Sequence, residues 1–238
     1  GSENNEDHLA ENLDSLRAKR PDILTKFMNN LMSESFVATV PSKFPTILSA
    51  ASEYKGISTD ILSRKADGKY DIRFANNGVI YKMTEMIAPD EFQSVMAPSS
   101  VYPDMQVMNW AVQDDSKMRV SFHYYLMAMR ANYAYFIPDD AAFEAYYDDP
   151  VYLKHEQPRV LKFYYDAKYP TQPVRCIAYA YNPETNEVGQ ALNNGANVDV
   201  ASWTSQMIDI MNYHTVVLDD GEVLGTNKYY KTKHGGAV

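Results

Sequence analysis

Apolar residues recur at helical spacing at several places along the chain. Residues 22–32 carry an apolar stripe behind Pro21, and proline suits the first turn of a helix, so this pattern predicts a helix. The same spacing predicts helices over residues 46–54, 105–112 and 202–211.

Residues 70–74 instead alternate between apolar and polar side chains, which is the period of a strand with one wet face. Asn77 and Gly78 follow, and an Asn-Gly pair favours a tight hairpin turn because both residues tolerate a positive φ. The pattern therefore predicts a β-hairpin whose return strand covers residues 79–87 and ends before Pro89.

Other apolar runs are short and end at turn residues, which is typical of strands. The all-apolar pattern of residues 133–137 predicts a strand that is buried on both faces and ends at Pro138. Asp139 is then placed to cap a helix over residues 140–147. Further predicted strands cover residues 36–40, 174–181, 187–192, 213–217 and 227–233. Residues 90–104 contain two prolines and three serines and are predicted to be a linker.

Composition narrows the classes of partner. The chain has 238 residues, 45% of them hydrophobic, and a formal net charge of −9, which argues against nucleic acid or an anionic membrane as the main partner. Its one cysteine, Cys176, cannot form an intramolecular disulfide, and this fits both a cytoplasmic protein and a bacterial secreted one. No apolar run approaches the roughly 20 residues that span a bilayer.

The segment at residues 132–143 and two other motifs resemble the fasciclin-like domain. Members carry Phe-x-Pro-x-Asp-x-Ala-Phe after an apolar strand, a Tyr-His pair after an apolar helix, and a closing Asn-Gly-Val-Ile hairpin before a proline. The matching residues are Phe136, Pro138, Asp140, Ala142 and Phe143, then Tyr213 and His214, then Asn77, Gly78, Val79, Ile80 and Pro89. Asp139 stands where Ser or Thr is usual.

The resemblance implies an α+β fold, a compact β-sandwich with helices packed at one side. The closing hairpin precedes the opening strand, so the order departs from a single domain. We interpret residues 1–92 as the C-terminal part of one fasciclin-like unit and residues 93–238 as the N-terminal part of a second. The second unit then carries an insertion at about residues 151–202.

The same resemblance implies a non-catalytic, extracytoplasmic adhesion or protein-binding module of a bacterial cell surface or outer membrane. It would attach through a lipid anchor outside this chain, and it is compatible with a homo-oligomer. Tyr213 and His214 resemble the pair that forms an adhesion surface in this family. The structural alternative is that Tyr213 packs in the core while His214 hydrogen-bonds at a helix-to-strand corner.

Tyrosines in the expected insertion offer a second function, that of a glycan-binding accessory module. Tyrosine rings can stack on sugar rings, and Tyr179 and Tyr181 are the candidates for this contact. Tyrosine is also a good strand former, so packing within a sheet is the alternative role for these residues.

No motif indicates catalysis or a cofactor. The chain lacks a Gly-x-Ser-x-Gly elbow, a phosphate-binding glycine loop and a His-Glu-x-x-His pair. Cys176 lies in an alternating apolar segment, where a buried inert thiol is expected. The histidines do not have metal-ligand spacing, and we interpret the Asp-Asp pairs at 114–115, 139–140, 148–149 and 219–220 as solvated turns and helix caps rather than calcium ligands.

Overall fold

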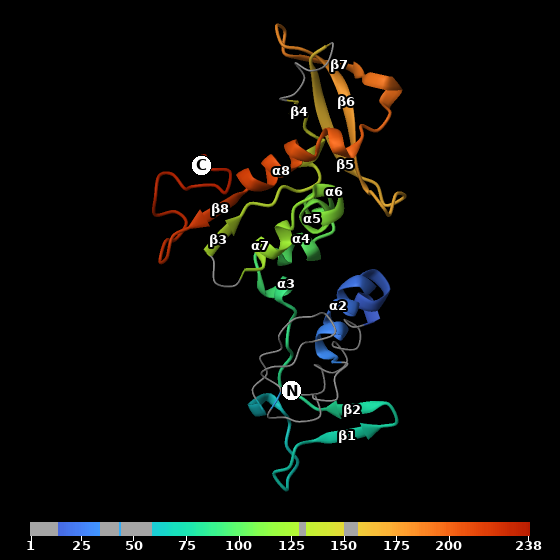
Figure 1. Cartoon of the computed structure of the whole chain (residues 1–238), viewed down its shortest axis with the longest axis vertical. Coiled ribbons are helices and arrows are strands. Elements are labelled where there is room, and N and C mark those ends of the chain that lie inside the picture. Colours follow the sequence, from blue (N-terminus) through green and yellow to red (C-terminus); the bar gives the residue numbers. More distant parts are fainter. Residues whose placement is uncertain (1–13, 34–42, 44–58, 129–131, 150–156) are drawn as a thin grey trace. The chain divides into compact units, whose positions relative to one another are not determined.

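The computed structural model describes residues 14–33, 43, 59–128, 132–149 and 157–238 (Figure 1). It divides into two compact units, Gly1–Asp90 and Glu91–Val238. Helices and antiparallel sheets occur together, so the fold is α+β. The strand and helix predicted over residues 36–40 and 46–54 lie outside the described residues.

In the first unit, helix α2 covers Pro21–Leu31, as the proline and the apolar stripe predict. Ile23 and Asn30 are its buried residues. Asn30 donates a hydrogen bond from Nδ2 to the carbonyl of Ile87 at 3.1 Å, which ties the helix to the chain that follows the hairpin.

The predicted hairpin is confirmed as β1 (Ile72–Ala75) and β2 (Gly78–Tyr81), with Ala75 opposite Gly78. The return strand ends at Tyr81, so its predicted extension to residue 87 is wrong. The turn conformation expected from the Asn-Gly pair is wrong, because Asn76, Asn77 and Gly78 all lack a positive φ. The hairpin is also more exposed than its alternation suggests, since Phe74 is 82% exposed.

The second unit begins with helices where a linker was predicted. Residues 90–104 form α3 (Asp90–Gln93) and α4 (Ala97–Val101), between which Met96 is buried. The serines of this stretch satisfy nearby groups, which explains how they fit a packed segment: Ser99 donates to the Met96 carbonyl, and Ser100 donates to Glu91. The linker prediction is therefore wrong.

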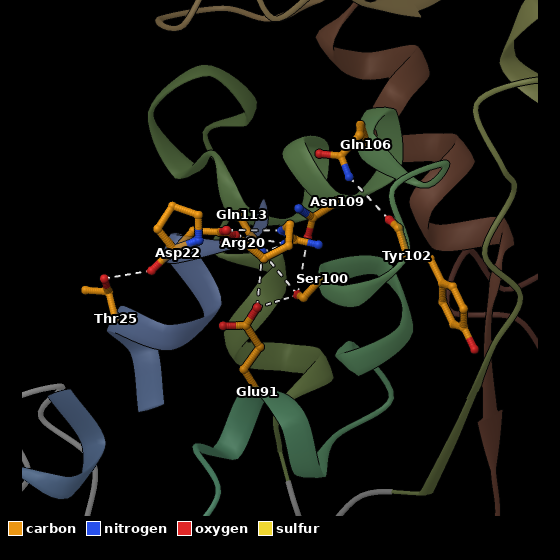
Figure 2. A network of polar contacts seen from close by, with 10 residues as sticks. Arg20, Asp22, Thr25, Glu91, Ser100, Tyr102, Gln106, Asn109 and Gln113 are labelled. Carbon is orange, nitrogen blue, oxygen red and sulfur yellow. Dashed lines mark hydrogen bonds and ion pairs between the residues drawn. The ribbon is translucent and has the colours of Figure 1, made fainter. Parts of the chain in front are cut away.

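A polar network joins these short helices to α5 (Gln106–Gln113), as Figure 2 shows. Gln113 donates from Nε2 to Oδ1 of Asn109 at 2.7 Å, and its amide also approaches Glu91 and Ser100 at 3.4 Å. Glu91 and Ser100 are buried away from water, so these contacts supply the hydrogen-bond partners that water would otherwise provide.

Three further helices complete the helical part of this unit: α6 (Asp115–Met118), α7 (Phe122–Leu126) and α8 (Thr204–Tyr213). The predictions over residues 105–112 and 202–211 are confirmed by α5 and α8. The helix predicted over residues 140–147 is reduced to a single 3₁₀ turn, Ala142–Glu144, followed by strand β4 (Tyr147–Asp148).

Strands β3 (Asn132–Tyr135) and β8 (Thr215–Leu218) pair antiparallel. The chain end extends this sheet: Lys233 donates its N–H to the Thr215 carbonyl, and Val217 donates to the Lys231 carbonyl. Of the strand predicted over residues 227–233, only bridges at Lys231 and Thr232 are present.

The larger sheet has the order β4-β5-β6-β7 (Figure 1). Its long strands are β5 (Arg159–Tyr165), β6 (Val174–Asn182) and β7 (Glu187–Ala191), all antiparallel. The hairpin predicted from residues 174–181 and 187–192 is confirmed. The expected insertion at 151–202 thus supplies three of the four strands, and its inward side chains belong to the main core.

The main core lies between this sheet and helices α5 and α8. Trp203 is its largest fully buried side chain, and its ring meets Phe163 at a centroid distance of 5.3 Å and an interplanar angle of 75°. Within the described ranges, every helix is too short or too polar to cross a membrane.

Candidate functional site

The four-stranded sheet has two chemically different faces. On β6, Val174, Cys176 and Ala178 are buried, and the residues between them are half-buried. On β5, Leu161 and Phe163 are likewise buried, and the register places them opposite Ala178 and Cys176. Because side chains alternate along a strand, the other face must carry the residues in between.

We call that second side the sheet outer face and define it by its half-buried residues Lys162, Tyr164, Arg175, Ile177, Tyr179 and Tyr181. Val160, opposite Tyr179 on the same side, is buried. The two candidate tyrosines of the glycan hypothesis therefore lie on one face of one strand. Tyrosine rings and basic groups share this face, so it can offer stacking surfaces together with hydrogen-bond donors.

Tyr179 is oriented by an aromatic neighbour. Its ring packs edge to face against Tyr146, with centroids 5.1 Å apart and an interplanar angle of 70°. Arg175 is oriented in a similar way, because its guanidinium lies 3.9 Å from the ring centroid of Tyr169. Such contacts restrict side-chain freedom before any partner arrives.

Tyr181 has a different surrounding. Its hydroxyl hydrogen-bonds to Oδ1 of Asn186, which has a φ of 58° in the β6–β7 turn. The same tyrosine lines a shallow open depression of about 480 Å³ together with the following residues of the hairpin: Ala180, Asn182, Glu187, Val188 and Gly189. Tyr181 thus both braces the turn and contributes to a concave surface.

Tyr213 and His214 separate at the end of α8. Tyr213 is 46% exposed and stacks on His234, with centroids 4.0 Å apart and an interplanar angle of 17°. His234 in turn lies 3.6 Å from Oδ1 of Asp209. His214 points back into the helix end, where its Nδ1 lies 2.8 Å from the Ile210 carbonyl.

The four residues proposed from the sequence consequently belong to two separate settings. Tyr179 and Tyr181 lie on the sheet outer face, whereas Tyr213 and His214 lie at the junction of α8 and β8. Tyr213 is a surface residue rather than a core residue, and His214 has the hydrogen bond that the structural alternative expects at a corner.

The Asp-Asp pairs are mostly caps and turns. Asp114 accepts from the Lys117 N–H at the start of α6, and Asp139 accepts from the Ala142 N–H. Asp149 is the exception, since it is fully buried and binds Arg159 through a hydrogen bond and ion pair. Interpreting this aspartate as a solvated turn is wrong.

Groups suited to nucleophilic or metal chemistry are not brought together in the described part of the chain. Burial raises the pKa of the Cys176 thiol to about 12, so the thiol is protonated at neutral pH. No group of three or more His, Cys, Asp or Glu residues that could hold a metal ion occurs among the described residues.

Sequence reasoning missed a pocket of about 450 Å³ beside the two-stranded sheet of β3 and β8. Its lining, which we call the Lys–Tyr pocket, consists of Tyr125, Val217, Asp219, Glu222, Tyr229, Lys231, Thr232 and Lys233. The alternation of lysine with polar residues near the chain end is the one signal in the sequence that could have indicated it, because alternate strand positions share a face.

Comparisons with protein-family models, with curated proteins and with solved structures gave no match. The resemblance carried by residues 132–143 therefore stays a prediction from its motifs. The sheet outer face and the Lys–Tyr pocket are the two surfaces from which a function can be argued.

Proposed function

We propose that this protein is a non-catalytic binding module displayed outside the cytoplasm at a bacterial cell surface, and that it binds its partner through the sheet outer face. The observation that carries the proposal is the chemical asymmetry of the four-stranded sheet. One face is buried in the core, and the other presents Tyr179 and Tyr181 beside basic side chains. The proposed fold is a fasciclin-like sandwich with helices at one side.

A protein partner fits this face in the first instance. Tyrosine and arginine are enriched at the centres of protein interfaces, because each combines a large contact area with hydrogen-bond donors. Tyr179 and Arg175 are held by Tyr146 and Tyr169, so less side-chain freedom is lost on binding. Tyr213, exposed at the end of α8, offers a second adhesive contact.

A glycan is the second candidate, and the depression beside Tyr181 favours it. Sugar-binding sites combine an aromatic surface with a few fixed polar groups. Here Tyr181 lines the same depression as Asn182 and Glu187, whose side chains supply an amide and a carboxylate for sugar hydroxyls.

The location and the attachment by a lipid anchor outside this chain rest on the family resemblance. Burial keeps the thiol of Cys176 protonated, which disfavours it as a nucleophile. We therefore propose no catalytic reaction and no cofactor.

Alanine variants of Tyr179, Tyr181 and Tyr213 test the proposal. Tyr165→Ala is the matched control, since Tyr165 lies on the same sheet, is 37% exposed, and alternates with Tyr164 toward the opposite face. Binding would be measured to intact bacterial and host cells, and to neutral polysaccharides by affinity gel electrophoresis.

Loss of binding in Tyr179→Ala and Tyr181→Ala with retention in Tyr165→Ala supports the sheet outer face. If the wild-type chain binds a polysaccharide and the two sheet variants do not, the partner is a glycan. If the wild-type chain still binds cells from which glycans have been removed and the two sheet variants do not, the partner is a protein. Equal binding by all four variants would exclude this face as the working surface.

A further inference from the structure

The Lys–Tyr pocket is formed by three parts of the second unit. Val217 comes from β8, Tyr125 comes from α7, and the remaining lining comes from the chain end, residues 219–233. Val217 donates its N–H to the Lys231 carbonyl and Lys233 donates to the Thr215 carbonyl, so residues 231–233 run as an extended neighbour of β8. Lys231 and Lys233 are two positions apart on this segment and therefore share one face.

These two lysines place positive charges close together. Alternate residues of an extended segment are about 6.7 Å apart at their Cα atoms, so both side chains start from the same face within reach of one small anion. Within the described part of the chain, neither forms an ion pair with a carboxylate. A carboxylate that reaches both ammonium groups gains two charge-assisted donors, which must offset the unfavourable net charge of −9.

Aromatic rings hold one ammonium group and form the walls. The Lys233 Nζ lies 4.4 Å from the ring centroid of Tyr125 and 5.3 Å from that of Phe122. Tyr229 lines the pocket and is 63% exposed; the Lys228 Nζ lies 5.1 Å from its ring centroid, so one face of the ring is left for stacking. Burial raises the pKa of the Tyr125 hydroxyl, which keeps it a neutral donor.

The acidic end of the pocket is already organised. Glu222 accepts the Asp219 N–H through Oε2 at 2.8 Å and the Asn227 amide through Oε1. Its carboxylate therefore braces the turn, whereas the Asp219 side chain lines the pocket as an acceptor for hydroxyl groups. The pocket thus offers cations at one side, an acceptor at another and an aromatic ring between them.

We infer that the Lys–Tyr pocket is a binding site for an acidic sugar, a pyranose that carries a carboxylate. The carboxylate lies between Lys231 and Lys233, the ring stacks on Tyr229, and sugar hydroxyls donate to Asp219. A pocket of about 450 Å³ falls within the usual range for small ligands, roughly 300–1,000 Å³. This site is distinct from the sheet outer face and does not depend on the function proposed for it.

Calorimetric titration with a short oligogalacturonate, and with the neutral galacto-oligosaccharide of the same length, tests the inference. The wild-type chain is expected to bind the acidic sugar and not the neutral one. Lys231→Gln and Lys233→Gln should each weaken binding about 10-fold, the loss of one charge-assisted hydrogen bond. Lys168→Gln removes the same charge from an exposed position of the same unit that lies outside both proposed surfaces, and it should leave affinity unchanged.

The lysine variants check each other. Lys231 is exposed, so Lys231→Gln still tests the site if Lys233→Gln disturbs folding. Tyr179→Ala and Tyr181→Ala should retain oligogalacturonate binding even if they abolish binding through the sheet. The inference is overturned by absence of binding, by equal affinity for the neutral sugar, by displacement with inorganic phosphate at the same concentration, or by an equal loss in Lys168→Gln.

Discussion

Arg159 donates a hydrogen bond from Nε to Oδ2 of Asp149 at 2.5 Å, and the aspartate side chain is fully buried. The other carboxylate oxygen accepts from Nε2 of Gln206 at 3.0 Å. This one carboxylate therefore connects the residue after β4 with the start of β5 and with helix α8. It holds the edge of the four-stranded sheet against the helix that covers the core.

Asp149→Asn should destabilise the second unit because it leaves the Arg159 guanidinium, 12% exposed, without its counter-charge. Breaking a buried pair at one partner costs about 3–5 kcal/mol of unfolding free energy. Urea unfolding, monitored by tryptophan fluorescence, measures this loss of unfolding free energy. The control is Glu144→Gln. Glu144 is 67% exposed and its partner Lys162 lies 3.9 Å away, so this change should cost at most about 1 kcal/mol. Similar costs for the two variants would contradict the assignment.

Gly78 in the hairpin should tolerate a side chain. It has no positive φ, and a Cβ placed there meets nothing within 4 Å. Gly78→Ala is therefore expected to change the stability of the first unit by less than about 1 kcal/mol. Any change should be stabilising, because alanine lowers the conformational entropy of the unfolded chain. Gly68 is the matched comparison in the same unit, because its φ is 79° and its Cβ position is also open.

Gly68→Ala should cost about 1 kcal/mol or more, since alanine is strained in the left-handed region. Thermal unfolding of both variants decides the matter. If Gly78→Ala lowers the unfolding temperature more than Gly68→Ala does, Gly78 has the positive φ that the Asn-Gly pair suggested from the sequence.

Cys176 should react with thiol reagents only when the chain unfolds. Burial raises its pKa from 9.0 to about 12, so the native chain holds almost no thiolate at pH 8. Labelling with a chromogenic disulfide should be slow in buffer and immediate in denaturant. A rapid native reaction would show an accessible thiolate and would revive the thiol as a candidate nucleophile.

The same shift has a stability consequence with a definite sign. The folded state keeps the proton that the unfolded thiol releases above pH 9, so the stability from this group is present below that pH and is lost as the pH rises toward 12. Cys176→Ala should remove this contribution to the decline of stability in alkaline solution.

Local patterns predicted the elements whose signal is complete within a few residues. The stripe behind Pro21 gives α2, and the alternation around Asn77 gives β1 and β2. The Asp139 cap is also present, yet the helix behind it ends after one turn. Its continuation, Tyr147–Asp148, pairs instead with β5 as strand β4, and this pairing with Val160 and Leu161 could not be seen from one segment.

Features that depend on distant partners were missed. Residues 90–104 look like a linker, because serine and proline favour loops, but Glu91, Ser100 and Gln113 satisfy one another once three short helices meet. The Lys–Tyr pocket requires α7, β8 and the chain end together. The alternating lysines indicate a shared face, but one segment does not show which elements complete the pocket. Tyr179 and Tyr181 were named for the stacking chemistry of their rings; that they share one face follows from strand alternation along β6.

Trp203 should be the residue whose truncation most affects the main core. It is completely buried, donates from Nε1 to the Val198 carbonyl at 3.3 Å, and contacts both Phe163 and Trp110. Trp203→Phe removes the hydrogen bond and leaves a cavity, at an expected cost of about 2–4 kcal/mol of unfolding free energy.

Because the chain has two tryptophans, the Trp203 variant leaves Trp110 as a single fluorescent probe of the second unit. Its denaturant midpoint should fall, while Tyr165→Phe on the exposed end of β5 should leave the midpoint within error of the wild type. An unchanged midpoint for Trp203→Phe would mean that the core is centred elsewhere, and the packing of α5 and α8 on the inner face of the sheet would then need to be reconsidered.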